Sequence, residues 1–185
     1  MKKLFALVMA LCCFMSCSVG VAGSRLNDYL QRKFEEMCIG GINFYATPDY
    51  IKGIYGEPSS EEVENKYYKE GRRPSPMVGY ITEYVYNYNN QLEIHLWQKT
   101  EEDYYRVSKV ICTAPNLTTP SGFKVGMHFS IVRNKYFTGK RHKNLKPMKN
   151  PNGELCYQMM ANRGVMNFYV DNHDIIRKLE ICYPW

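Results

Sequence analysis

The side chains that could carry out chemistry are few and scattered along the chain. The sequence has four histidines, and no pair of them has a metal-binding spacing such as His-x-x-x-His. Cys156 could act as a nucleophile only beside a histidine such as His173 and an orienting group. The segment Asp171–Asp174 could hold a cation, but a hairpin turn explains it better. The sequence also has no phosphate loop, no Gly-x-Ser-x-Gly and no spaced carboxylate pair, so we predict no catalytic residue, metal or cofactor.

Aromatic residues provide the better functional prediction. The chain is 14% aromatic and contains 16 tyrosines, and rigid aromatic side chains often anchor interfaces. Strand periodicity places four tyrosines on one face of one strand and three further residues on one face of the next, and two residues near the C-terminus are their counterparts. This predicted binding face comprises Tyr80, Tyr84, Tyr86, Tyr88, Glu93, His95, Trp97, Asn167 and Tyr169.

The exposure of this face has to be considered separately for the tyrosines and for Trp97. The tyrosines could instead pack on helices as part of the core, but Ile81 and Val85 on the other face of the strand are the more obviously apolar pair. Trp97 is expected to be exposed, because Leu92, Ile94 and Leu96 alternate with it and would occupy the core side.

A second candidate surface is a basic loop between residues 134 and 149. It contains six cationic side chains and no acidic one, and it would attract lipid headgroups or an acidic protein. A solvated loop is the simpler interpretation. The six residues are Lys135, Lys140, Arg141, Lys143, Lys146 and Lys149.

The N-terminal segment, residues 1–23, reads as an export signal. Lys2 and Lys3 precede an apolar run from Leu4 to Met15, which is shorter than the roughly 20 residues that a spanning helix needs. Two cleavage sites compete: a loose lipobox that would lipidate Cys17, and an ordinary peptidase site before Ser24. The protein is therefore expected to be periplasmic, anchored to the outer membrane by lipid, or secreted.

Charge and cysteine content limit the partners. Removing the signal lowers the formal net charge from +6 to +4, too small an excess for a typical nucleic-acid binder, and an exported protein seldom meets nucleic acid. Four cysteines remain after the signal: Cys38, Cys112, Cys156 and Cys182. In an oxidising compartment they could form two disulfides, with three connectivities, or they could be buried free thiols.

The hydrophobic pattern predicts an α+β protein. Helices are expected over residues 24–37, 49–55 and 129–136, and strands over 77–88, 91–99, 103–113, 155–161, 165–170 and 175–183. Asn89-Asn90 is the turn signal between the first two strands. The polar segments 57–76 and 137–153 are expected to be loops, the former with a helical turn near residues 61–68.

An internal repeat organises these elements. The segment that starts at Gly41 aligns without a gap with the one that starts at Gly122, so that Ile51 meets Val132 and Tyr55 meets Tyr136. Each copy is followed by strand-like sequence. We therefore expect two tandem units, 24–118 and 119–185, each with short helices packed on an antiparallel meander, and the two sheets side by side.

The second copy carries a family resemblance. A Gly-hydrophobic-x-hydrophobic-Gly-Met start at Gly122 leads to a short helix ending at Tyr136, and the last hairpin runs from Phe168 to Leu179. Over about residues 38–185 this resembles the β-lactamase-inhibitor-protein-like fold, and also the envelope assembly lipoproteins of the BamE/SmpA type and small exported proteins of unknown function from Bacteroidetes. Copy one departs from the motif at Tyr45-Ala46.

The resemblance implies two helix-plus-sheet units with a concave binding face. It does not carry over inhibition, because the family's inhibitory hairpin presents an acidic residue and the corresponding turn here, residues 87–91, has none. We therefore expect an exported, non-catalytic module that binds another envelope or extracellular protein. The alternatives are a structural lipoprotein of an envelope assembly complex, and a secreted enzyme inhibitor or unrecognised enzyme.

Overall fold

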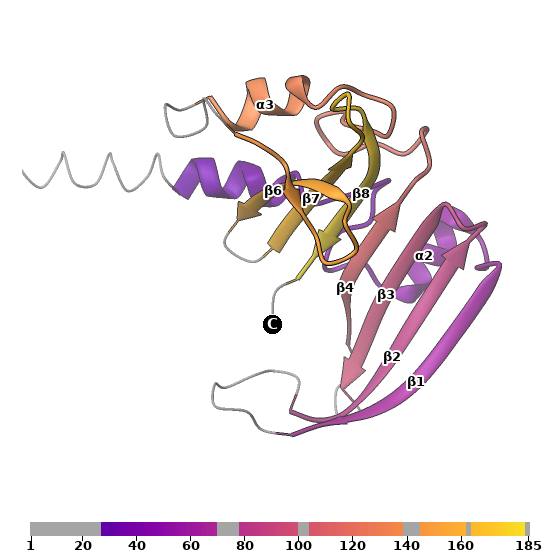
Figure 1. Cartoon of the computed structure of the whole chain (residues 1–185). Coiled ribbons are helices and arrows are strands. Elements are labelled where there is room, and N and C mark those ends of the chain that lie inside the picture. The colour runs from indigo at the N-terminus through magenta and orange to yellow at the C-terminus, as the bar shows by residue number, and fades with distance from the viewer. Residues whose placement is uncertain (1–26, 70–77, 100–103, 139–144, 162–163, 184–185) are drawn as a thin grey trace, which may run out of the picture.

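A computed structural model describes residues 27–69, 78–99, 104–138, 145–161 and 164–183. The predicted export signal, with Cys17, therefore lies outside the described residues. The described part is an α+β fold with one antiparallel sheet (Figure 1). Its strands are β1 (Ser60–Tyr68), β2 (Gly79–Tyr88), β3 (Leu92–Lys99), β4 (Tyr105–Cys112), β5 (Met148–Lys149), β6 (Leu155–Ala161), β7 (Gly164–Val170) and β8 (Ile176–Cys182).

The predicted loop over residues 57–76 is wrong at β1. This segment is rich in Glu, which is depleted in strands, and apolar and polar residues do not alternate in it as they do in a half-buried strand. It forms a strand because it pairs along its whole length with β2, from Ser60 opposite Asn87 to Tyr68 opposite Gly79. Most of its side chains are exposed, so the hydrophobic pattern gives no signal for it.

The turn between β2 and β3 contains one residue more than expected. Asn89 and Asn90 have φ of 54° and 58°, a left-handed conformation that Asn tolerates. The Gln91 N–H donates to the Tyr88 carbonyl at 3.1 Å, yet Tyr88 is paired with Leu92. Gln91 is thus an extra residue at the end of the hairpin, and the register of β3 is shifted by one relative to a two-residue turn.

The strands form one continuous sheet in the order β1-β2-β3-β4-β8-β7-β6-β5. The sequence predicted two sheets side by side. The two halves instead join where β4 and β8 pair over four residues, from Lys109 opposite Cys182 to Cys112 opposite Leu179. This pairing satisfies backbone groups that two separate sheets would each leave unpaired at an edge.

Three helical segments accompany the sheet. Residues 27–35 are helical, and they are followed by α2 (Pro48–Tyr55) and α3 (Ser130–Tyr136). The Thr47 side chain caps α2 by accepting from the Tyr50 N–H at 3.3 Å, and Gly56 ends it with φ of 76°, as Pro at the first position and Gly after the last favour. Among the residues described, no helix is both long and apolar enough to cross a bilayer.

The hydrophobic core lies on one face of the sheet. Ile51 of α2, Val132 of α3 and Met37 after the first helix share one buried cluster with sheet residues such as Ile94 and Phe168. We call this side the core face. The pairing registers assign the alternate residues of every strand to the other side, which we call the opposite face.

Candidate binding surface

The predicted binding face is divided between the two sides of the sheet. Tyr84 pairs with Leu96, and Tyr86 pairs with Ile94, so the tyrosine row lies on the core face. Glu83 pairs with Trp97, which places Trp97 on the opposite face with His95 and Glu93. The prediction that these two rows line one surface is therefore wrong, and the extra turn residue Gln91 is the reason.

Half of the tyrosine row belongs to the core. The Tyr88 ring lies 5.4 Å from that of Tyr55 in α2, and its hydroxyl donates to the Gly56 carbonyl at 3.2 Å. Lys52 lies 5.5 Å above the Tyr86 ring, and burial raises the pKa of Tyr86 to about 12. Tyr86 and Tyr88 are thus covered by α2 and cannot contact a partner directly.

Trp97 is also buried, with 1% of its surface exposed, so the predicted exposure is wrong. It forms a small cluster with Ile81, and Tyr68 packs against that cluster. Beside it, His95 Nε2 lies 2.5 Å from Glu93 Oε1. The opposite face thus has a small apolar cluster of its own.

Asn167 and Tyr169 lie on the same face as Glu93, His95 and Trp97, as predicted, but both are buried. The Asn167 side-chain amide donates to Glu180 Oε1 at 2.7 Å, and the Tyr169 hydroxyl donates to the same oxygen at 3.2 Å. Lys178 Nζ lies 3.8 Å from the centre of the Tyr169 ring. These residues form a satisfied polar network rather than an exposed aromatic surface.

Beyond α2 the core face carries a further group of aromatic residues, and its exposed part lies at the lower ends of β1 and β2 in Figure 1, while Tyr84 and Tyr105 are partly buried against the core. Tyr67 and Tyr80 are 57% and 66% exposed, and Val63 is 55% exposed. The Tyr67 and Tyr80 rings lie 4.9 Å apart, and those of Tyr84 and Tyr105 lie 5.6 Å apart. We call these five residues the aromatic strip; sequence reasoning missed its members Val63, Tyr67 and Tyr105.

The length of the strands explains why α2 leaves the strip uncovered. Tyr80 lies eight residues from Tyr88, or about 26 Å along an extended strand. The eight residues of α2 span only about 12 Å, and they contact the Tyr86–Tyr88 end.

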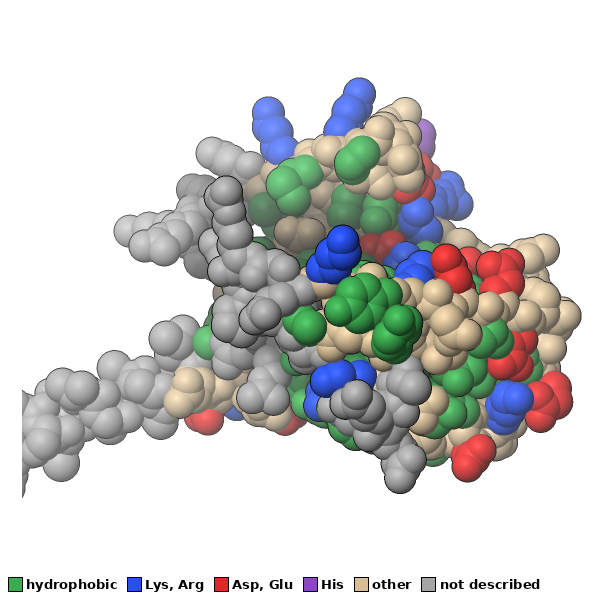
Figure 2. Space-filling model, turned by 90° about the horizontal axis from the view of Figure 1, so that it is seen from below, with side chains coloured by type: hydrophobic (Ala, Val, Ile, Leu, Met, Phe, Trp, Pro, Cys, Tyr) green, Lys and Arg blue, Asp and Glu red, His purple; other side chains and the backbone are tan. Residues whose placement is uncertain are grey.

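Seen from below, hydrophobic side chains gather near the middle of the surface, with Lys, Arg, Asp and Glu around them (Figure 2).

The basic loop is described only in part. Lys135, Lys146 and Lys149 are exposed, in agreement with a solvated segment. Lys140, Arg141 and Lys143 lie outside the described residues. Lys135 is not free, because its ammonium group donates to the Ser121 hydroxyl.

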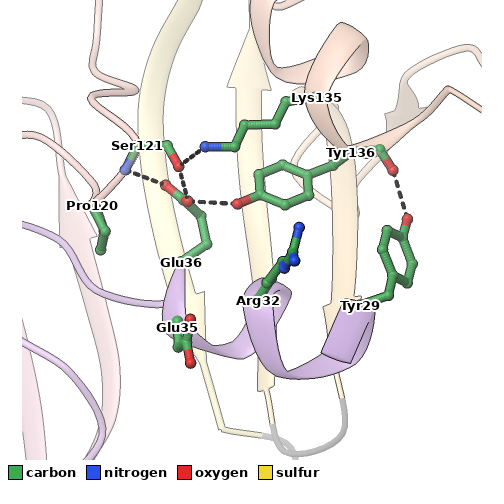
Figure 3. A pocket seen from close by; sticks show the side chains of 8 residues that line it. All are labelled: Tyr29, Arg32, Glu35, Glu36, Pro120, Ser121, Lys135 and Tyr136. Carbon is green, nitrogen blue, oxygen red and sulfur yellow. Dashed lines mark hydrogen bonds between the residues drawn. The ribbon is translucent and has the colours of Figure 1, made fainter. Parts of the chain in front are cut away.

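That contact belongs to a pocket of about 360 Å³ between the first helix and α3 (Figure 3). At its side, Glu36 is 2% exposed. Its carboxylate accepts from the Tyr136 hydroxyl at 2.7 Å, from the Ser121 N–H at 3.1 Å, and from the hydroxyls of Thr119 and Ser121. An ionised carboxylate has about four acceptor positions, so these four donors fill its hydrogen-bonding capacity. The Glu36 carboxylate thus links parts of the chain to one another; we call this set of hydrogen bonds the internal tie.

The cysteines are free thiols in the structure, and no disulfide joins Cys38, Cys112, Cys156 or Cys182. Burial raises the pKa of Cys156 to about 11 and that of Cys182 to about 12. A thiol held in its neutral form is a poor nucleophile. Within the described ranges, no group of His, Cys, Asp and Glu side chains could hold a metal ion.

Comparisons with known proteins provide little further information. No protein-family model matches the chain, and no curated protein matches it. A solved structure of a cysteine-rich secretory protein from Staphylococcus aureus subsp. aureus Mu50 aligns at 11% identity with a TM-score of 0.38. The alignment covers 73% of this chain and 41% of that one, so the chain spans less than half of that protein's length. A TM-score this low does not define a shared fold.

Proposed function

We propose that this protein is an exported, non-catalytic module that binds another protein through the aromatic strip. The observation that carries the proposal is the exposure of Tyr67 and Tyr80, two neighbouring rings tilted by 53° to each other and each more than half exposed to solvent. Clustered exposed apolar surface on a monomer is characteristic of interaction sites. Tyr suits this role because it offers a large, rigid contact area at low conformational cost.

The surroundings of the strip support a protein partner. Polar groups lie between the rings: the Thr82 hydroxyl donates to Asn65 Oδ1 at 2.8 Å, and the Tyr84 hydroxyl donates to Gln98 Oε1 at 3.4 Å. An apolar centre with polar neighbours is the usual composition of a protein–protein interface. The strip is the surface of paired strands, which suits a protein better than a small molecule.

Export and tandem origin belong to the same proposal. The basic and apolar N-terminus supports export, with or without lipid on Cys17. Two tandem units, as in the β-lactamase-inhibitor-protein-like fold, are supported by the aligned glycines, because Gly41 and Gly122 have similar φ of 86° and 81°. Each is followed by a short helix and an antiparallel meander in the described chain.

The test is affinity capture from envelope extract and culture medium. The parent protein is compared with a Tyr67→Ser, Tyr80→Ser variant and with a control variant, Tyr45→Ser, Tyr50→Ser. The control removes two tyrosines that are also about half exposed, at 54% and 51%, but belong to α2 and the segment before it and are not members of the strip. Circular dichroism confirms that both variants are folded.

We expect one protein to be captured by the parent and by the control but lost, by at least tenfold, with the strip variant. Equal capture by all three proteins would show that the strip is not the recognition surface. Failure of the parent to retain any protein would contradict the binding function itself.

A further inference from the structure

Strand β1 is a long open edge of the sheet. It is the first strand in the order β1-β2-β3-β4-β8-β7-β6-β5, and within the described residues only β2 pairs with it. Its nine residues extend for about 30 Å along the outer margin of the molecule (Figure 1). The backbone groups on its outer side form a template on which a further strand can add.

The sequence of this edge complements itself when the strand is turned end to end about Asn65. In an antiparallel pair of β1 strands with a two-fold axis at Asn65, the two Asn65 residues face each other. Each residue before Asn65 in one copy then faces the residue equally far after Asn65 in the other copy. Acidic residues then oppose Lys or Tyr, and Val opposes Tyr. The pairs are Glu64 with Lys66, Val63 with Tyr67, Glu62 with Tyr68, and Glu61 with Lys69.

We propose that two copies of the chain associate edge to edge through β1, antiparallel, with the two-fold axis at Asn65. The axis is perpendicular to the sheet, so each face continues into the same face of the second copy. Glu64 and Lys66 lie on the opposite face, because they are paired with Glu83 and Ile81 of β2. Each of the two charged pairs then forms twice.

Registers with the axis at a neighbouring residue are disfavoured by like charges. A two-fold axis at Glu64 sets that carboxylate opposite itself, and an axis at Lys66 does the same with its ammonium group. An axis at Val63 sets Glu62 opposite Glu64 twice. Like charges directly opposite each other destabilise an antiparallel pair, so among axes from Val63 to Lys66 only the one at Asn65 avoids them.

The charges of β1 could simply protect the edge from other strands, as edge lysines often do. A protective edge repels any strand irrespective of the order of its charges. Here the order matters, because the chain already shows the attraction: Lys66 lies 2.9 Å from Glu64 and 2.6 Å from Glu83. Glu64 is 67% exposed in its side chain and is available to a second Lys66.

The core face adds apolar contact to the same register. Val63 and Tyr67 are more than half exposed, and each would oppose the other across the two-fold axis. Their contact covers surface that a single copy leaves in water. The two aromatic strips then become one continuous strip, although the association itself does not depend on a partner binding there.

The experiment measures the mass of the purified protein by sedimentation equilibrium over about 1 to 100 µM. The parent is compared with Lys66→Glu, with Glu64→Lys, and with an equimolar mixture of the two. Lys124→Glu, a charge reversal at an exposed residue away from β1, is the control. Circular dichroism establishes that each variant is folded.

We expect the parent and the control to be dimers. Each β1 variant sets like charges opposite each other and should raise the dissociation constant at least tenfold. The mixture should restore the dimer, because the introduced ammonium of one chain faces the introduced carboxylate of the other, and the native Lys66 and Glu64 face each other too. A monomeric parent, dimers unaffected by both reversals, or a mixture that stays monomeric would overturn the proposal.

Discussion

The Tyr136 hydroxyl donates a 2.7 Å hydrogen bond to the carboxylate of Glu36, 100 residues earlier in the chain. This bond ties the first helix to α3. A second bond, from the Tyr29 hydroxyl to the Tyr136 carbonyl at 2.8 Å, fixes the same pair of elements. The first helix therefore belongs to the fold and is not an independent N-terminal extension.

Replacement of Glu36 by Gln should weaken the fold. The amide has one acceptor oxygen where four donors converge, and its NH₂ group would face donors. Hydrogen bonds to a charged group contribute about 1.5–3 kcal/mol, so we expect Glu36→Gln to lower the free energy of unfolding by about that amount in urea titrations. Glu35→Gln, at an exposed neighbour on the same helix, is the control and should change it by less than about 0.5 kcal/mol. Equal effects of the two substitutions would contradict the tie.

Trp97→Ala should destabilise the protein strongly, because the indole is buried with Ile81 and Tyr68. Truncation of a buried Trp typically costs about 3–5 kcal/mol. Tyr80→Ala, at the most exposed tyrosine of the strip, should cost less than about 1 kcal/mol. Urea unfolding monitored by circular dichroism measures both. If the Trp97 variant were as stable as the parent, the side chain would be exposed, as the sequence predicts, and not buried.

Asp171 should make the stability depend on pH in the acid range. Its carboxylate accepts from the Ile175 N–H at 3.0 Å, from Arg177, and from the His173 N–H at 2.8 Å. These bonds lower its pKa from the ordinary 3.8 to about 2. Because the folded-state pKa is depressed, the contribution is complete above about pH 4 and is lost as the pH falls towards 2.

Asp171→Asn removes this titrating group. The urea midpoint of the parent should therefore fall more steeply than that of Asp171→Asn between about pH 4 and pH 2. Parallel curves for the two proteins over this interval would show that the turn does not hold the carboxylate in its ionised form.

The thiols of Cys156 and Cys182 should react slowly in the folded protein. Burial raises the pKa of Cys156 from 9.0 to about 11, which at pH 8 lowers the thiolate fraction on the order of a hundredfold. Alkylation by iodoacetamide, followed by peptide mass spectrometry, should show this slowing relative to the protein in urea. Equal rates in both states, or a disulfide between any two of the four cysteines, would contradict the structure.

Local patterns identified most of the elements. The alternation of Leu92, Ile94 and Leu96 places them correctly on the core face, and Pro48 and Gly56 bound α2 within a residue of the predicted helix. β1 could not be found in this way, because an exposed edge strand lacks buried alternation and is stabilised by its pairing with β2.

The binding face could not be assembled from periodicity alone. Periodicity fixes which residues of one strand share a face, but the relation between two strands depends on the turn. With a two-residue turn, Tyr88 would oppose Gln91, and the tyrosines would lie on the face of His95 and Trp97. The extra residue Gln91 sets Tyr88 opposite Leu92 instead, and a shift of one residue exchanges the faces. In addition, α2 covers only one end of the tyrosine row, so Tyr86 is buried while Tyr80 stays exposed.

Site-specific photocrosslinking in the producing cell shows whether the aromatic strip contacts the partner. A photoreactive phenylalanine is placed at Tyr80 on the strip in one variant and at His95 on the opposite face in a second variant. We expect a crosslink to another protein from position 80 and none from position 95. A crosslink from position 95 alone, or from neither position, would contradict it.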